Sequence, residues 1–124
     1  MTDTTLIDRM GIALLAVAAD RTTGTMPVAG NVQPTGILHG GASAVLAETL
    51  GSLAAQAYAG PQRTAVGIEL NVTHHRPARE GVVTGEARAL SLGRSLASYE
   101  IVVTGEDGKR VATARLTCMI LDRR

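Results

Sequence analysis

The sequence predicts an α+β domain in which one long helix packs against one mainly antiparallel sheet. Residues 40–58 carry apolar side chains at helical spacing, whereas four later segments alternate with a period of two. The length of 124 residues, with 45% hydrophobic and 19% charged residues, suits a single domain with its own core. We therefore expect residues 1–124 to form one domain, ordered strand, strand, helix and then four strands.

Two segments before the helix predict a short hairpin. Ile12–Ala18 and Thr22–Val28 have the composition of strands, and Asp20-Arg21 lies between them as the turn.

The helix is predicted over Gly40–Tyr58, and Gly60-Pro61 ends it. Glu48 in its middle and Gln56 near its end make a membrane-spanning segment unfavourable. We expect a buried helix, whose core-facing stripe consists of Leu46, Leu50, Leu53 and Ala57.

Four strands follow the helix in a predicted, mostly antiparallel meander. Even-numbered positions are apolar in both the first and the last of them, and Glu106-Asp107-Gly108 forms a hairpin turn before the last. The four strands are Val66–Thr73, Val82–Leu90, Leu96–Val103 and Val111–Leu121.

Composition argues against several classes of partner. The net charge of +1 provides no broad positive field for nucleic acid, and 2% aromatic residues leave few stacking platforms. The single cysteine, Cys118, excludes a disulfide framework, favours a reducing compartment and is expected in the core. Because the N-terminus lacks a basic-then-apolar run, we expect a cytoplasmic protein without a membrane partner.

Glu48 is the one carboxylate between Arg21 and Arg63. A lone helix glutamate is usually a solvated surface residue. Here the predicted neighbours on its face are small or uncharged, which indicates that something other than water covers this face and favours a base or nucleophile. Ser52, four residues further on, either orients Glu48 or is a small packing residue. The neighbours in question are Gly41, Val45, Ser52 and Ala55.

The loop before the helix ends in His39-Gly40-Gly41. Free backbone N–H groups at a helix N-terminus, next to glycines, can approach and polarise a substrate oxygen. A glycine at a helix start is also ordinary, and His39 can simply be a capping or core residue.

His74-His75 does not predict a metal site. Adjacent strand residues point to opposite faces, and no cluster of cysteine or carboxylate ligands completes a set. Arg76, Arg79 and Arg94 follow strands, where they would suit a phosphorylated ligand. Solvation, or pairing with nearby glutamates, is the alternative for these arginines.

The segment Gln33-Pro34-Thr35-Gly36-Ile37-Leu38-His39-Gly40-Gly41-Ala42, followed by Ala47-Glu48-Thr49 and Gly51-Ser52, resembles the hotdog-fold acyl-CoA thioesterases. The match is strongest to the PaaI-like branch, which includes the Arthrobacter-type 4-hydroxybenzoyl-CoA thioesterases. The resemblance extends from about Gly11 to Leu121 and implies a helix wrapped by a curved antiparallel sheet of five to six strands.

The resemblance also implies roles for individual residues. Glu48 matches the carboxylate that attacks the thioester carbonyl or activates water, and the Gly40 N–H matches the group that polarises this carbonyl. Gln33 and His39 match residues that hold the thioester or leaving thiolate, and Ser52 matches one that positions water. Candidate substrate-binding residues, for coenzyme A above all, are Asn31, Gly41, Asn71, His74, Arg76, Arg79, Gly93, Arg94 and Ser95.

The spacing of two of these residues predicts a homodimer. Gly40 and Glu48 are eight residues apart, roughly 12 Å along one helix, yet both must lie about 3 Å from one carbonyl group. Two antiparallel helices from two subunits satisfy this requirement, so the site is expected across a two-fold interface. The resemblance also implies a tetramer built from two such dimers. It implies no cofactor.

The leading hypothesis is therefore hydrolysis of an aroyl-, phenylacetyl- or short- to medium-chain acyl thioester of coenzyme A or a carrier protein. One alternative is a hotdog hydratase or dehydratase with a histidine base. The other is an acyl-CoA-binding module without catalysis.

Overall fold

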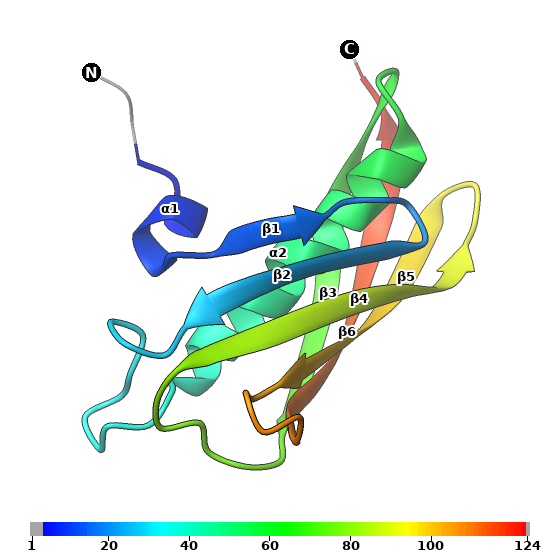
Figure 1. Ribbon diagram of the computed structural model, residues 1–124. Helices are drawn as coiled ribbons and strands as arrows, with labels where there is room; N and C mark the ends of the chain where they lie inside the picture. The colour runs from blue at the N-terminus through cyan, green and yellow to red at the C-terminus, as the bar shows by residue number, and fades with distance from the viewer. Residues whose placement is uncertain (1–3, 124) are drawn as a thin grey trace.

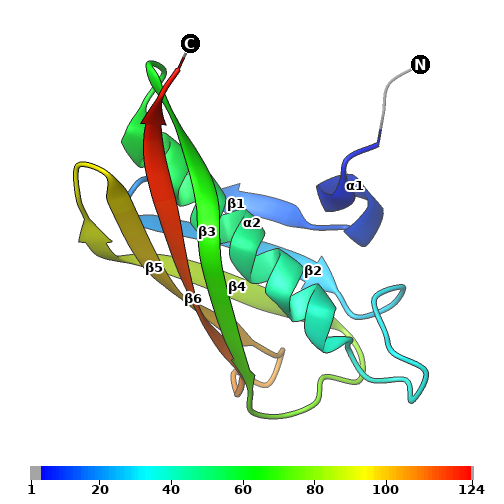
Figure 2. The same cartoon turned by 180° about the vertical axis from the view of Figure 1, so that it is seen from behind.

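A computed structural model describes residues 4–123 as one helix held in the curve of a six-stranded antiparallel sheet (Figures 1 and 2). The predicted domain also includes residues 1–3 and 124, which lie outside the described part. The long helix α2 covers Gly40–Ala59, one residue beyond its predicted end. The strands are β1 (Ala13–Ala16), β2 (Arg21–Pro27), β3 (Arg63–His74), β4 (Val82–Leu92), β5 (Leu96–Thr104) and β6 (Arg110–Asp122).

A short N-terminal helix, α1 (Leu6–Met10), was not predicted. The Thr5 side chain caps it by accepting a hydrogen bond from the Asp8 N–H, and Gly11 ends it with φ of 73°. These are ordinary helix boundary signals, but the helix is too short to show an apolar period.

The strand order differs from a simple meander. The order is β1-β2-β4-β5-β6-β3, so β4, β5 and β6 are consecutive neighbours while β3 forms the outer edge beside β6. The place beside β4 is occupied by β2, which pairs with it from Arg21↔Arg88 to Pro27↔Val82. Because α2 carries the chain across the sheet, β3 begins at the far edge, and the segment 75–81 then crosses back to β4 (Figure 2).

The buried side of α2 is rotated from the predicted leucine stripe. Leu46 and Leu50 are fully buried, as expected, but Leu53 is only half-buried and Ala57 is exposed. The centre of the contact is formed by small residues, which let the helix lie close to the large side chains of the sheet. These small residues are Ala47, Gly51, Ala54 and Ala55.

The regular alternation predicted for β3 stops at a bulge. The pairing with β6 changes register between Gly67 and Glu69, which leaves Ile68 as the extra residue. Val66 pairs with Met119 and is exposed, as is Ile68, so neither contributes to the core. The even-numbered pattern holds only beyond the bulge, where Leu70 pairs with the buried Leu116. In β6 the predicted alternation is confirmed.

No helix within residues 4–123 has both the length and the apolar character needed to cross a membrane.

Tyr99 anchors the sheet to the loop between β1 and β2. Its ring is fully buried and its hydroxyl donates a hydrogen bond to the Ala19 carbonyl at 2.6 Å. Burial, with smaller contributions from the charges of Cys118, Tyr58 and Asp20, raises the pKa of Tyr99 to about 12.

We expect the free energy of unfolding to fall between pH 10 and 12 because of Tyr99. Its pKa of about 12 in the folded state exceeds the ordinary value of 10.0, so its stabilising contribution is complete below pH 10 and is lost toward pH 12. At 1.36 kcal/mol per pKa unit, the loss amounts to at most about 2.7 kcal/mol. Urea unfolding across this pH range measures it.

Tyr99→Phe should remove this part of the pH dependence and cost about 1 kcal/mol at neutral pH through the lost hydrogen bond. Tyr58→Phe is the matched control, because it removes a phenol that donates to the Gly93 carbonyl from a half-buried side chain. Equal alkaline slopes for the wild type and Tyr99→Phe would contradict the assignment to Tyr99.

Candidate active site

The N-terminus of α2 has one backbone N–H group without a partner. His39 caps the helix: its Nδ1 accepts a hydrogen bond from the Gly41 N–H at 2.8 Å, and its carbonyl accepts from Ala42 and Ser43. As the first helical residue, Gly40 has no acceptor within the helix, and no hydrogen bond in residues 4–123 uses its N–H. The capping role considered for His39 is therefore present, and the Gly40 N–H is free for a ligand.

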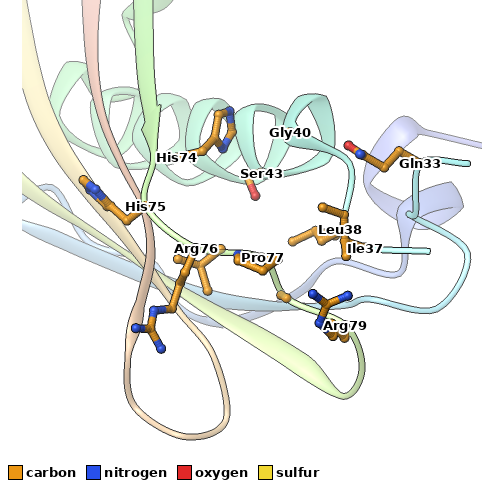
Figure 3. Close-up of a pocket in the computed structure, with 12 residues that line it drawn as sticks. Gln33, Ile37, Leu38, Gly40, Ser43, His74, His75, Arg76, Pro77 and Arg79 are labelled. Carbon is orange, nitrogen blue, oxygen red and sulfur yellow. The ribbon is translucent and has the colours of Figure 1, made fainter. Parts of the chain in front are cut away.

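A cleft of about 460 Å³ lies beside this N-terminus (Figure 3). Gly40 and Gln33 line it, and the His74 ring borders Gly40 so closely that a Cβ on Gly40 would lie 3.0 Å from His74 Nε2. Arg76 and Arg79 line the same cleft from the loop after β3. The other lining residues are Ile37, Leu38, Ser43, His75, Pro77, Ala78 and Val111.

Gln33 has one of its amide hydrogens engaged inside the loop. Its Nε2 donates to Thr35 Oγ1 at 2.9 Å, and the side chain remains half-exposed in the cleft. The other N–H of this amide group can therefore donate to a bound molecule.

A second cleft, of about 340 Å³, contains Glu48 and Ser52. The two residues are one helical turn apart on α2, and the Glu48 side chain is exposed. Apolar residues from α1 and α2 line the rest of the cleft: Leu6, Ile7, Val45 and Leu53, together with Thr49.

Leu6 and Ile7 were missed as candidate site residues. Only the capping signal of Thr5 and Asp8 and the glycine after α1 could have indicated a helix there, and neither shows where that helix packs.

Four of the five predicted catalytic residues thus fall into two separate clefts of the same chain, and the fifth, His39, lines neither. Gln33 and Gly40 share the first cleft, and Glu48 and Ser52 share the second. Gly40 and Glu48 both belong to α2, where eight residues correspond to about 12 Å. One chain therefore holds the Gly40 N–H and the Glu48 carboxylate too far apart for both to reach one carbonyl group.

Asn31 and Gly41 use their polar groups within the chain. The Asn31 amide donates to the carbonyls of Met10 and Pro27, each at 2.8 Å, and so ties the loop before α2 to the N-terminal segment. The Gly41 N–H is bound to the His39 ring.

Three further candidates lie near the opposite end of α2 from Gly40. Gly93, Arg94 and Ser95 form the turn between β4 and β5, where the Gly93 carbonyl accepts from Tyr58 near the end of α2. Asn71 is exposed on β3 and donates to Glu69. None of these four lines either cleft.

The adjacent histidines face opposite sides of β3, as predicted. His74 lies against Gly40, whereas His75 forms a 2.9 Å hydrogen bond with Thr113 Oγ1. Among residues 4–123, no group of three or more histidine, cysteine or carboxylate side chains is arranged to hold a metal ion.

Cys118 is a buried free cysteine beneath the second cleft. Burial raises the pKa of its thiol, the nearby Ser52 hydroxyl lowers it, and the Glu48 charge raises it. Since the net effect is a raised pKa, the thiol stays protonated and is a poor nucleophile.

Comparison with known proteins identifies the family of this chain. Residues 35–112 match the family model of the thioesterase superfamily. The chain is 48% identical over 120 residues to the proofreading thioesterase EntH of Klebsiella pneumoniae, covering 96% of this chain and 88% of that protein. It is 47% identical to a putative esterase of Deinococcus radiodurans, covering 94% and 74% of the two chains.

Solved structures of thioesterases have a similar fold. A thioesterase from Haemophilus influenzae superposes with a TM-score of 0.89 at 38% identity, covering 94% of this chain and 82% of that one. A mutant thioesterase from Pseudomonas aeruginosa also gives 0.89, at 41% identity and with 96% and 87% covered. The chain belongs to the thioesterase superfamily and is a thioester hydrolase with the hotdog fold.

Proposed function

We propose that this protein hydrolyses an acyl-CoA thioester at a site shared by two protomers. One protomer contributes the cleft of Gly40 and Gln33, and its partner contributes the cleft of Glu48 and Ser52. The observation that carries the proposal is the separation of the two clefts on one rigid helix, about 12 Å by helical rise. A polarising donor and an attacking group must both lie about 3 Å from the reacting carbonyl group.

In this site, the free Gly40 N–H polarises the thioester oxygen at the positive end of the α2 dipole. The Glu48 carboxylate, from the partner, attacks the carbonyl carbon directly or removes a proton from the attacking water. Ser52 lies one turn along the same helix, where its hydroxyl can orient that water. Gln33 donates its remaining N–H to the thioester or the leaving thiolate.

The capping contact of His39 argues against the hydratase alternative. Nδ1 accepts the Gly41 N–H at 2.8 Å, so the lone pair of the ring is engaged and the proton of a neutral ring lies on Nε2. A histidine base needs a free lone pair. His39 therefore acts as a hydrogen-bond donor through Nε2, which suits a leaving thiolate.

The first cleft suits the phosphorylated end of coenzyme A. Arg76 and Arg79 line it, both are exposed, and neither forms an ion pair within residues 4–123. Guanidinium groups bind phosphates through charge-assisted hydrogen bonds. Arg94, in the turn between β4 and β5, does not line this cleft. A carrier-protein thioester remains the alternative substrate.

The second cleft suits the acyl group. Leu6, Ile7, Val45 and Leu53 give it aliphatic walls, and no aromatic side chain lines it. Recognition therefore depends on shape and apolar contact, which fits aroyl, phenylacetyl and short- to medium-chain acyl groups. A hydrolysis screen over these coenzyme A esters, with a thiol-detecting reagent, identifies the acyl group.

Replacing Glu48 should abolish turnover without unfolding the protein. Glu48→Gln keeps the size of the side chain but removes its charge and nucleophilicity, and should lower kcat by about 10²-fold or more. Glu69→Gln is the matched control, because it neutralises another exposed carboxylate outside both clefts. An assay of thiol release measures kcat for both variants. If Glu48→Gln keeps more than about a tenth of the wild-type kcat, Glu48 has no catalytic role.

Arg76→Ala and Arg79→Ala should raise KM for the coenzyme A ester more than for the same acyl group on truncated pantetheine. The reason is that a phosphate contact is lost only when the substrate has phosphates. Arg94→Ala serves as the comparison outside the cleft and should leave both KM values near wild type. Equal effects on the two substrates would mean that Arg76 and Arg79 are ordinary surface charges.

Mixed dimers test the shared site. Gly40→Pro deletes the polarising N–H at a helical position that tolerates proline, and Glu48→Ala deletes the carboxylate. Each homodimer should be inactive, whereas a heterodimer has one site with both lesions and one intact site. Purified heterodimers from co-expression should therefore have about half the wild-type activity.

Gly40→Ala controls for crowding against His74, because it adds the same Cβ but keeps the N–H. It should retain far more activity than Gly40→Pro. Heterodimers that form but remain inactive would reject the shared site.

A further inference from the structure

Gly67 of β3 lies directly against the Glu48 carboxylate. A Cβ built on Gly67 would stand 2.8 Å from Glu48 Oε2 and 3.9 Å from its Cδ. The next nearest atom, Leu116 Cδ1, would be at an ordinary 3.5 Å. The carboxylate therefore occupies the volume that any other side chain at this position would need.

The backbone itself does not require a glycine here. Gly67 lies inside β3 and is not among the glycines with positive φ, so an L-residue could adopt its conformation. A glycine inside a strand lowers stability, since it loses more conformational freedom on folding and adds no packing. The missing side chain is thus explained by the space that it leaves for Glu48.

We propose that Gly67 is a positioning residue for Glu48: its bare backbone, just before the bulge of β3, seats the carboxylate against the sheet and fixes its direction in the second cleft. This inference rests on the catalytic role proposed for Glu48. Leu116, paired with Leu70 beyond the bulge, bounds the same seat. A carboxylate seated in this way has fewer orientations available than one on a freely solvated helix face.

The residue opposite Gly67 on β6 also lies close to the polar residues of the second cleft. Gly67 pairs with Cys118 of β6, and the Cys118 thiol is close enough to Ser52 and Glu48 for both to influence its pKa. The strand pair β3–β6 therefore contacts both polar residues of the second cleft from below. Ser52 is held over the small Cys118 side chain, and Glu48 over Gly67, which has none.

Gly67→Ala tests the proposal. The clashing atom is at the end of a flexible side chain, so the protein should fold while the carboxylate is displaced. Since misplacing a reacting group by about 1 Å can cost about 10²-fold, we expect kcat to fall at least about 10-fold. KM should stay within about threefold of wild type, because binding contacts are untouched. A merely structural role for Gly67 would not separate kcat from KM.

Glu48→Asp provides the rescue. The shorter side chain withdraws its carboxylate from residue 67, so Gly67→Ala should reduce kcat much less in the Glu48→Asp background than in the wild type. Thermal unfolding of Gly67→Ala, with and without Glu48→Ala, covers the case of a destabilised variant. A loss of stability that disappears when Glu48 is truncated supports the contact, and a loss that persists overturns it.

The outcomes separate this inference from the function on which it rests. If Glu48→Gln is inactive and Gly67→Ala retains wild-type kcat, the seat is rejected and the catalytic carboxylate stands. If Glu48→Gln remains active, the proposed function fails, and the positioning role fails with it. Equal effects of Gly67→Ala in the wild-type and Glu48→Asp backgrounds would also overturn the seat.

Discussion

The close approach of α2 to the curved sheet is the contact on which the rest of the structure depends. Small residues on the helix make it possible, and Gly51 shows how tight it is: a Cβ there would lie 2.6 Å from Leu116 Cδ2. A larger residue would push the helix away and open a void in the core. The depth of this contact sets both the height of Glu48 over β3 and the place where the N-terminus of α2 meets His74.

The same helix separates the polar groups of the two clefts. Its first amide, at Gly40, has no acceptor within the helix, whereas His39 binds the next three. Its carboxylate, at Glu48, lies two turns further on, exposed in the second cleft and beside Gly67 of β3. A helix is rigid over this distance, so no adjustment of one chain unites the two groups. Under the proposed function, the second protomer supplies the carboxylate, and its own rigid helix holds this group at a fixed position.

The edge strand β3 shapes the surroundings of the candidate site, although it adds little to the core. Gly67 leaves space for the Glu48 side chain, and the His74 ring lies beside Gly40. The bulge at Ile68 changes which residues of β3 face the core. A bulge at an edge commonly redirects side chains near an active site. β3 thereby lies against one residue of each cleft, Gly40 and Glu48, although few of its side chains enter the core.

The sequence by itself determined the fold class, the long helix, every strand to within a few residues, and the presence of a free N-terminal amide and a lone carboxylate on that helix. These features depend on local period, on glycine and proline, and on residue spacing along one element. Only the tertiary structure decided that β3 lies beside β6, that small residues rather than Leu53 face the sheet, and that Arg94 is remote from Arg76. These features depend on contacts between segments that are distant in the sequence. Such a contact produces no hydrophobic periodicity in either segment, so the sequence pattern does not reveal it.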